Sequence, residues 1–368
     1  MARKAGVIRV GIAGLGRSGY HLHARWLHAV PQRFKIVAVC DELPGPRREA
    51  EREFGAVAYR THRELLRAGG CDVFVNALPS FLHVPATLDA LRAGCHVVCE
   101  KPVAPRAADA ERLMAEAKRT GRLLAPFHNS RFFPFFRKIR DLIGSGKFGE
   151  LVFVRINWSD FGRRWDWQTL QRYQGGGLRN AGSHLMDHAL TLFGDREAPR
   201  VFARMSCHNP FGADADDFAN VILYGKRSPT VEVVVSRYQA YPQGGQCDVS
   251  GQYGGLSGGV EAVKWKYFDP RRAPKRKLMK GWAEKRQFCH EELPWVEGEW
   301  KQPAEAATNP FLYNSRLFYE NFYDAFARGG KLEVTMEQAR RQVAAIEECW
   351  RQNPLPRTEG GTRAGRRA

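Results

Sequence analysis

The sequence of 368 residues has no apolar run near the roughly 18 residues that a membrane-spanning helix needs. An apolar patch follows Arg3 and Lys4, but it is short and runs into a glycine-rich turn. We therefore interpret it as a first strand and not as a signal peptide. Cysteines stand at positions 40, 71, 95, 99, 207, 247, 289 and 349, without a CxxC pair. This spacing argues against a zinc site or a disulfide framework and predicts buried thiols in a reducing cytoplasm.

The sequence also lacks internal repeats, a helix-turn-helix pattern and repeated basic-aromatic platforms. Its formal net charge is nonetheless +18. Segment 271–286 carries a net +7, from eight Lys/Arg against one Glu, and segment 353–368 carries a net +3, which leaves +8 elsewhere. Because such runs are usually solvated, we expect no specific nucleic-acid partner. Attraction of an anionic substrate and weak nonspecific binding to nucleic acid stay open.

A glycine turn near the N-terminus is the first positive signal. Residues 8–12 are a strand-type apolar run, and Gly14, Gly16 and Gly19 form G-x-G-x-x-G where an amphipathic helix begins. In a strand-turn-helix unit these glycines permit a tight turn, close approach of a pyrophosphate and close packing of the helix on the strand. The helix start then faces the phosphates with free N–H groups. The residues predicted to hold a dinucleotide here are Gly14, Leu15, Gly16, Arg17, Ser18 and Gly19.

An acidic residue follows the second strand-type run. Residues 34–40 form that run and Asp41 ends it, 25 residues after Gly16, which is close to the spacing of an acid that binds an adenosine ribose. The alternative is a turn residue ahead of a Pro-Gly pair. An acid here repels a 2′-phosphate, so NAD is favoured as the cofactor. The nearby Arg47 and Arg48 keep NADP open.

Strand and helix patterns alternate over the first third of the chain. Predicted strands lie at 8–12, 34–40, 56–59, 73–78, 96–99 and 123–125, with helices between them at 46–54, 61–64 onward, 83–93 and 107–120. This order predicts an α/β fold that starts with a doubly wound parallel sheet, an NAD-binding Rossmann domain over residues 1–128.

After residue 128 the alternation of strands and helices gives way to strands with few helices between them. Predicted strands lie at 151–158, 201–207, 218–224, 230–238 and 263–268, and predicted helices at 132–143, 182–193, 311–328 and 336–352. They predict a second α/β domain, over residues 129–352, with a large, mostly antiparallel sheet. The basic segment 271–308 gives no clear pattern. Residues 353–368 are predicted to be a disordered basic tail.

Parallel strands of the first domain end at the cofactor crevice, so residues 76–79 and Glu100-Lys101-Pro102 should meet there. Most lysines are solvated surface charges. A lysine at a strand end, beside a bound nicotinamide, instead loses solvation, and its pKa falls toward neutrality. Lys101 is therefore a candidate for proton transfer.

A second constellation follows a glycine run at 175–177. This turn leads into a helical segment that carries Asn180, His184 and His188, a good way to present side chains to a cleft between domains. The two histidines are four residues apart, a spacing that can bind a metal. No HExxH arrangement and no nearby cysteine support one, so we predict no metal site. On spacing alone, a buried, hydrogen-bonded imidazole is the stronger interpretation of His184.

Several motifs occur in one order along nearly the whole chain. They are the glycine turn at 14–19, ALPSFLH at 77–83, AGCHVVCEKP at 93–102, HNSRFFP at 128–134, GKFGE at 146–150, GGGLRNAGSHLMDHAL at 175–190 and VTMEQARRQVAAIEECW near the end. Together they resemble the glucose-fructose oxidoreductase / inositol dehydrogenase (Gfo/Idh/MocA) family. The EKP and GGG…GxH motifs are specific in combination.

The resemblance implies a Rossmann domain followed by an α/β domain whose open sheet is often used for oligomerisation, hence a homodimer or homotetramer. It also implies a nicotinamide cofactor and a sugar, inositol or related polyol as substrate. By residue match, Lys101 and His184 correspond to the catalytic lysine and histidine of the family. The family commonly has an aspartate four residues before that histidine, where this chain has Asn180. An amide cannot relay a proton.

Other site residues follow from their strand-end positions or from the family match. Beyond the glycine turn, the predicted cofactor-binding residues are Asp41, Asn76, Leu78, Pro79, His83, Glu100, Lys101 and Asn129. The predicted substrate-binding residues are Lys101, Arg131, Trp165, Trp167, Asn180 and His184. For the two tryptophans, stacking on a sugar face and a place in the core both stay open.

These residues predict NAD(P)-dependent oxidation of a secondary alcohol on a sugar-like ring, or the reverse reduction. His184, held by Asn180, would accept the hydroxyl proton, and Lys101 would hydrogen-bond the developing alkoxide while hydride passes to the nicotinamide. Two alternatives stay open. One is a redox-neutral glycosidase, epimerase or isomerase with tightly bound NAD. The other is a catalytically silent NAD-dependent binding or regulatory protein.

Overall fold

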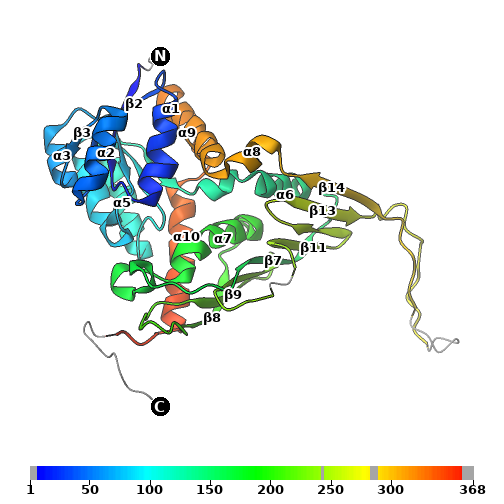
Figure 1. The fold of residues 1–368 in the computed structure, drawn as a ribbon. Helices are drawn as coiled ribbons and strands as arrows, with labels where there is room; N and C mark the ends of the chain where they lie inside the picture. The colour runs from blue at the N-terminus through cyan, green and yellow to red at the C-terminus, as the bar shows by residue number, and fades with distance from the viewer. Residues whose placement is uncertain (1–5, 242–243, 282–288, 359–368) are drawn as a thin grey trace.

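The alternating strands and helices of the N-terminal part form a parallel sheet with helices on its faces (Figure 1). The computed structural model describes residues 6–241, 244–281 and 289–358. Six strands pair in the order β3-β2-β1-β4-β5-β6, and each pairing is parallel. They are β1 (Ile8–Ala13), β2 (Phe34–Cys40), β3 (Val57–Tyr59), β4 (Val73–Asn76), β5 (His96–Glu100) and β6 (Leu124–Phe127). The predicted doubly wound parallel sheet is confirmed, and the strand order reverses between β1 and β4, where such sheets bind dinucleotides.

Helices connect these strands close to the predicted positions. They are η1 (Gly19–Ala24), α1 (Arg25–Ala29), α2 (Pro44–Phe54), α3 (His62–Ala68), η2 (Ser80–Leu82), α4 (His83–Arg92) and α5 (Ala107–Thr120). Local chemistry sets their ends. The Thr61 hydroxyl accepts a hydrogen bond from the N–H of Glu64 at the start of α3, and Gly121, with φ +65°, ends α5.

The second sheet has eight strands in the order β14-β13-β12-β11-β7-β10-β9-β8. They are β7 (Leu151–Ser159), β8 (Arg200–Ser206), β9 (Phe218–Tyr224), β10 (Thr230–Ser236), β11 (Cys247–Gly251), β12 (Gly254–Gly258), β13 (Ala262–Tyr267) and β14 (Val296–Lys301). The pairing of β7 with β10 is parallel, and the other neighbouring pairs are antiparallel. The predicted large, mostly antiparallel sheet is therefore confirmed.

Three of these strands were not predicted. β12 is rich in glycine, and β11 carries Asp248 and Gly251, residue types that strands usually avoid. Neighbouring backbone explains the glycines of β12: a Cβ at Gly254 would lie 2.2 Å from the carbonyl oxygen of Lys266, and one at Gly255 would lie 2.3 Å from that of Val249. β14 lies at the edge of the sheet and is mostly exposed, so its sequence carries little apolar alternation.

The remaining helices cover one face of the large sheet or return to the first domain (Figure 1). They are η3 (Asn129–Phe132), α6 (Pro134–Gly144), η4 (Trp167–Thr169), η5 (Gln171–Tyr173), α7 (Gly177–Phe193), α8 (Ala304–Thr308), α9 (Pro310–Arg328) and α10 (Met336–Gln352). Apolar side chains of α6, α7 and α10 form one core with the covered face of the sheet. α9 instead packs Phe318, Tyr319 and Phe322 into the core of the parallel sheet. No helix in the described ranges combines the length and apolarity that a membrane crossing requires.

Helix α7 begins five residues earlier than predicted, at Gly177 instead of 182. The cause lies far away in the sequence. Asp216 accepts a hydrogen bond from the N–H of Gly177 through its carbonyl and from that of Leu178 through its carboxylate, each at 2.7 Å. A Cβ on Gly176, whose φ is +122°, would lie 2.0 Å from the Asp216 carboxylate. The glycine run therefore leaves room for Asp216, a residue outside the helix, to cap the N-terminus of α7.

The first part of the predicted disordered tail is bound to the second domain. Asn353 is buried and accepts a hydrogen bond from the N–H of Met205, and the N–H of Thr358 donates to Asp214. Residues 359–368 lie outside the described residues. In the basic segment 271–286, residues 271–281 form an irregular connection after β13, and residues 282–286 also lie outside the described residues.

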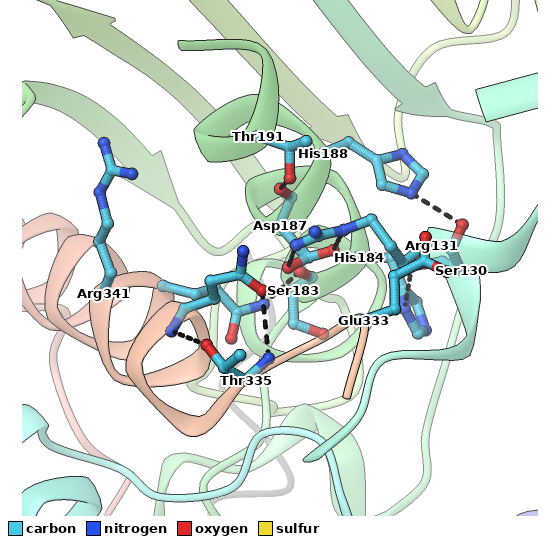
Figure 2. A network of polar contacts seen from close by, with 12 residues as sticks. Ser130, Arg131, Ser183, His184, Asp187, His188, Thr191, Glu333, Thr335 and Arg341 are labelled. Atoms are coloured by element: carbon cyan, nitrogen blue, oxygen red, sulfur yellow. Dashed lines mark hydrogen bonds and ion pairs between the residues drawn. The ribbon is translucent and has the colours of Figure 1, made fainter. Parts of the chain in front are cut away.

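A buried ion pair joins the end of the parallel sheet to α7. The guanidinium of Arg131, in η3, donates to both carboxylate oxygens of Asp187, with N–O distances of 2.8 and 2.5 Å (Figure 2). Both side chains are almost fully buried. Such a pair contributes little net stability against an apolar replacement, but removing one partner leaves an uncompensated charge in the interior.

We expect Arg131→Met to lower the free energy of unfolding by about 3–5 kcal/mol, because it strands the Asp187 carboxylate in the core. Urea denaturation of the purified protein measures this value. The double variant Arg131→Met/Asp187→Leu should recover most of the loss. Arg351→Met, which breaks an exposed pair with Glu348, is the control and should change stability little. Equal losses for the two arginine variants would contradict the structural role of the buried pair.

Candidate functional site

The end of β5, from the first domain, contacts the start of α7, from the second. Lys101 follows the last residue of β5, and its ammonium Nζ donates to both the backbone carbonyl and the side-chain Oδ1 of Asn180, each at 3.2 Å. Burial lowers the pKa of Lys101; Glu100 opposes this shift, while the charges of Arg17 and Arg164 add to it. The structure thus brings together two of the residues that the sequence placed at the catalytic centre.

His184 lies one helical turn beyond Asn180 on α7. Its Nδ1 is 3.1 Å from the hydroxyl oxygen of Ser130, which belongs to η3. Burial lowers the pKa of His184 well below 6.5, and the nearby charge of Lys101 lowers it further. The imidazole is therefore neutral at neutral pH, the form that a general base requires. When Nδ1–H donates to Ser130, Nε2 holds the lone pair that accepts a proton.

Ser130 was not predicted, although it lies inside the HNSRFFP motif. Its hydroxyl contacts His184, and its carbonyl accepts a hydrogen bond from Nε2 of His188 at 3.0 Å (Figure 2). With the Arg131–Asp187 pair, η3 therefore contacts three residues along one side of α7. Arg131, which was predicted to bind substrate, has a buried guanidinium that pairs with Asp187, and its contact with a substrate stays a prediction.

Asn180 connects Lys101 to the segment that precedes the glycine run. Its Nδ2 donates to Oε1 of Gln168 at 3.0 Å, and the same oxygen accepts a hydrogen bond from Arg164 at 2.6 Å. The amide is thereby oriented with its oxygen toward the lysine. Because an amide oxygen accepts but cannot take up a proton at neutral pH, Asn180 positions Lys101 and does not relay its proton.

The two tryptophans of this segment are not core residues. Trp165 is 78% exposed and lies edge-on to Phe211, with ring centroids 5.9 Å apart. Trp167 is 37% exposed and lies edge-on to Tyr173. The core interpretation is therefore excluded for Trp165, and stacking of either ring on a sugar stays a prediction.

The glycine turn has the shape that a pyrophosphate needs. A Cβ on Gly14 would lie 2.4 Å from the carbonyl oxygen of Ala77, and one on Gly19 would lie 1.8 Å from that of Gly14. These two glycines therefore serve the turn and the packing of the helix. A Cβ on Gly16 would meet no atom within 4 Å. The space beside Gly16 is open, which fits the close approach of a dinucleotide to the backbone.

Asp41 stands at the end of β2 beside this turn. One carboxylate oxygen accepts a hydrogen bond from the N–H of Leu15 at 2.8 Å, and the other accepts one from that of Leu43 at 2.9 Å. The turn interpretation and the cofactor interpretation of Asp41 are thus compatible. The carboxylate is fixed at the position where a ribose-binding acid stands in such folds, and each oxygen retains a further lone pair.

Two other predicted cofactor-binding residues, His83 and Asn76, form hydrogen bonds that link the loops after β4 and β5. His83 is 2% exposed, and its ring nitrogens lie 2.7 Å from the carbonyl oxygen of Pro102 and 2.8 Å from that of Leu78. Asn76 is fully buried and donates to the carbonyl of His83 at 2.9 Å. Both side chains hold the loops after β4 and β5 together, and their contact with a cofactor stays a prediction.

A chain of hydrogen bonds that ends on the backbone of Lys101 was not predicted from the sequence. Nδ1 of His23 is 2.6 Å from the hydroxyl of Tyr319 in α9, and Nε2 is 3.3 Å from a carboxylate oxygen of Glu100. The other oxygen of Glu100 accepts a hydrogen bond from the N–H of Lys101 at 3.1 Å. All three side chains are buried, and the contact of Glu100 with a cofactor stays a prediction.

The Glu100 carboxylate lies at one end of this chain of hydrogen bonds and the Tyr319 hydroxyl at the other. Burial raises the pKa of Tyr319 well above 10, so its hydroxyl stays protonated and can donate to Nδ1 of His23. Burial also acts to raise the pKa of Glu100, but the hydrogen bond from His23 and the neighbouring positive charges, Lys101 among them, outweigh it, so the pKa of that carboxyl is lowered. His23 then donates from Nε2 to the carboxylate, and no nearby sequence motif signals the contact because Tyr319 lies 296 residues away.

Leu78 and Pro79 are partly buried at the crevice, and Asn129 is buried at the end of β6. Within the described residues, no group of three or more His, Cys, Asp or Glu side chains is arranged to hold a metal ion.

Both domains match profiles of one protein family. Residues 8–128 match the oxidoreductase family with an NAD-binding Rossmann fold, and residues 136–257 match the GFO/IDH/MocA C-terminal domain. The two matches follow each other along the chain in the order in which the structure places the two sheets.

Curated relatives agree with these matches. The chain is 25% identical over 363 residues to the scyllo-inositol 2-dehydrogenase (NADP(+)) IolW of Bacillus subtilis, covering 97% of this chain and 96% of the relative. It is 31% identical over 194 residues to D-glucoside 3-dehydrogenase of Escherichia coli, covering 51% and 54%. It is also 31% identical over 191 residues to an uncharacterised oxidoreductase of Schizosaccharomyces pombe, covering 51% and 52%. The chain thus spans about half the length of the latter two relatives.

The fold recurs in solved structures. The WlbA dehydrogenase of Bordetella pertussis, in complex with NADH and UDP-GlcNAcA, superimposes with a TM-score of 0.76 at 21% identity, covering 95% of this chain and 96% of that one. From the two consecutive domain matches and the full-length relative, we conclude that the chain belongs to the Gfo/Idh/MocA family of NAD-binding oxidoreductases.

Proposed function

We propose that the protein is an NAD(P)-dependent dehydrogenase that oxidises a secondary alcohol of a sugar, inositol or related polyol, or reduces the corresponding ketone. The contact of Lys101 with Asn180, one helical turn from the neutral imidazole of His184, carries this proposal. Relatives named inositol and glucoside dehydrogenases support the substrate class.

In the proposed reaction, Nε2 of His184 takes the hydroxyl proton of the substrate. The ammonium group of Lys101 donates a hydrogen bond to the oxygen as negative charge develops on it. Asn180 holds the ammonium group through its carbonyl and side-chain oxygens. The cofactor, bound at the glycine turn and Asp41, supplies the hydride acceptor at its nicotinamide ring. In reduction, His184 returns the proton.

The silent binding-protein alternative is less well supported. A protein without catalysis has no need for a buried lysine with a lowered pKa beside a neutral histidine, since desolvating an ammonium group costs free energy. The redox-neutral alternative uses the same residues. Product analysis without added cofactor distinguishes it from a dehydrogenase that accumulates reduced nicotinamide.

The oligomeric state and the cellular location of the protein are also proposals. We infer a homodimer or homotetramer, because Phe202 and Tyr224 lie 57% and 40% exposed on the uncovered face of the large sheet. Exposed apolar patches of this kind mark interaction surfaces. The cysteines of the described residues are free thiols, which supports a cytoplasmic location.

One prediction concerns the proposed catalytic pair, Lys101 and His184. Lys101→Met and His184→Asn should each lower turnover by roughly 100-fold or more, because each removes a proton-transfer or charge-stabilising group. NAD affinity, measured by fluorescence titration, should stay within a few-fold. Reduced-nicotinamide absorbance, with a panel of monosaccharides, inositols and sugar acids, reports turnover. Lys118→Met, at an exposed position on α5, is the matched control. Normal turnover in either catalytic variant would refute the assignment.

The second prediction is a pH profile. Oxidation needs neutral His184, and its lowered pKa keeps it neutral to below pH 6.5. The acidic limb of kcat/KM should therefore lie below 6.5. Protonated Lys101 is needed to stabilise the alkoxide. Because the pKa of Lys101 is lowered, rising pH deprotonates it before pH 10.5 is reached. The alkaline limb should therefore lie below 10.5.

Asn180→Asp tests the origin of that alkaline limb. A carboxylate in place of the amide oxygen, 3.2 Å from Nζ, would raise the pKa of Lys101 and move the alkaline limb upward. Asn309→Asp makes the same change at the start of α9 and keeps the side-chain oxygen that accepts from Leu312, so its profile should match the wild type. An unmoved limb in Asn180→Asp would rule out Lys101 as its source.

The third prediction concerns cofactor choice. Asp41→Asn removes the charge that repels a 2′-phosphate and keeps a side chain able to accept and donate hydrogen bonds. The ratio of kcat/KM for NAD to that for NADP should fall about tenfold or more, as expected for losing hydrogen bonds to a charged group. Glu42→Gln, at the exposed neighbouring position, is the control. A ratio unchanged in Asp41→Asn would show that the carboxylate does not select the cofactor.

A further inference from the structure

A pocket beside His184 has no role in the reaction described above. Its volume is about 110 Å³, and it lies between the start of α6, the end of β7, α7 and the start of β11. Apolar side chains dominate its wall, including Phe133, Phe135, Trp158 and Cys247. His184 forms part of the same wall. A substituent of the ring, on the side of the reacting carbon away from Asn180, would therefore enter an apolar space.

Polar atoms of three side chains around this pocket have partners elsewhere, and one of them, Oδ1 of Asn157, accepts a hydrogen bond from the Ser159 hydroxyl at 2.5 Å. Nε2 of His188 donates to the carbonyl of Ser130, and its ring stacks on Phe136 with centroids 3.6 Å apart. Burial lowers the pKa of His188 to about 4, so the ring carries no charge at neutral pH. Oε1 of Gln246 accepts a hydrogen bond from the N–H of Val260. A polar ligand group placed here would lose its hydration and gain few new hydrogen bonds.

The region around Asn180 has the opposite character. Asn180, one turn before His184, borders a second cavity, of about 30 Å³, with Arg164, Gln168 and Asp216 in its wall. This polar wall can exchange hydrogen bonds with a hydroxyl group of a substrate. Along one side of α7, the site therefore changes from polar at Asn180 to apolar beyond His184 within a single helical turn.

We propose that the substrate is amphiphilic: a polyhydroxylated ring that carries an apolar substituent, which occupies the pocket lined by Phe135, Trp158 and Cys247. An apolar cavity of about 150 Å³ holds benzene, so the present volume takes a substituent of about four or five carbons. This inference rests on the proposed function, because it places the reacting alcohol at His184. It assigns the preference among ring alcohols to a pocket outside the catalytic pair.

The test compares methyl, butyl and octyl β-D-glucosides, whose polar rings are identical. Binding to the NAD-loaded full-length protein is measured by isothermal titration, and turnover by reduced-nicotinamide absorbance. Burying one methylene strengthens binding by up to about fourfold. Butyl glucoside should therefore bind at least about tenfold more tightly than methyl glucoside. The octyl chain, which exceeds the pocket, should add little further affinity.

Cys247→Met fills the pocket from β11 and should reduce the preference for butyl over methyl to within about twofold. Cys349→Met is the matched control, because Cys349 is an equally buried free cysteine in the same apolar core but not in the pocket wall. It should keep the wild-type preference. Circular dichroism verifies folding. Val260→Phe, on the partly exposed turn between β12 and β13, fills the pocket from its rim if Cys247→Met does not fold.

The outcomes separate this inference from the proposed function. Equal affinity for methyl and butyl glucosides, no binding of either, or a preference that survives both filling variants would overturn the apolar subsite, whether or not turnover occurs. A preference that the filling variants abolish, without reduced nicotinamide from any ring alcohol, would support the subsite and contradict the dehydrogenase assignment alone.

Discussion

The geometry of the site depends on the contact between η3 and α7, with the buried pair of Arg131 and Asp187 at its centre. The pair fixes one short segment at the end of β6 against the helix that carries the candidate base. On either side of Asp187, His184 and His188 contact the hydroxyl and the carbonyl of Ser130. A buried ion pair is weak evidence for stability but has a strict geometry. Here it sets the rotation of α7, and thereby the direction of both imidazoles.

Lys101 is positioned by separate braces behind the crevice. The hydrogen bonds from Tyr319 through His23 to Glu100 end on the backbone N–H of Lys101, and His83 holds the next carbonyl, that of Pro102. The lysine thus projects from a backbone fixed on both sides. Because Tyr319 comes from α9, the C-terminal part of the chain completes the support of a residue in the first domain. This explains why α9 packs its aromatic side chains into the parallel sheet.

The sequence predicted what local patterns encode and missed what distant residues impose. The strands of the parallel sheet and the limits of α5 and α10 follow from apolar runs, capping residues and terminal glycines, and these are local signals. The start of α7 is different, since Asp216 supplies its N-terminal acceptors from a loop 38 residues away. β11 and β12 were missed because neighbouring backbone lies too close for a side chain at Gly251, Gly254 and Gly255, whereas strand propensity disfavours glycine.

The candidate site divides in the same way. Lys101, His184 and the glycine turn were proposed as site residues from motifs, because each motif joins residue type to a fixed position on a strand end or helix start. The hydrogen bonds that Glu100, Asn76 and Arg131 make inside the protein were not predictable, since residue type alone does not show which partner a buried side chain has. His23 and Tyr319 belong to no motif in common. Only the packing of α9 on the first domain brings them together.

The amide at position 180 affects both candidate catalytic groups at once. A carboxylate there would stabilise the ammonium form of Lys101 and, through its field, the protonated form of His184, and so raise both pKa values. The amide accepts the same hydrogen bond from Nζ without a full negative charge. Burial lowers both pKa values, and the charge of Lys101 lowers that of His184 further. A neutral histidine near a lysine that is hydrogen-bonded to an amide is the arrangement on which the proposed role of His184 as proton acceptor rests.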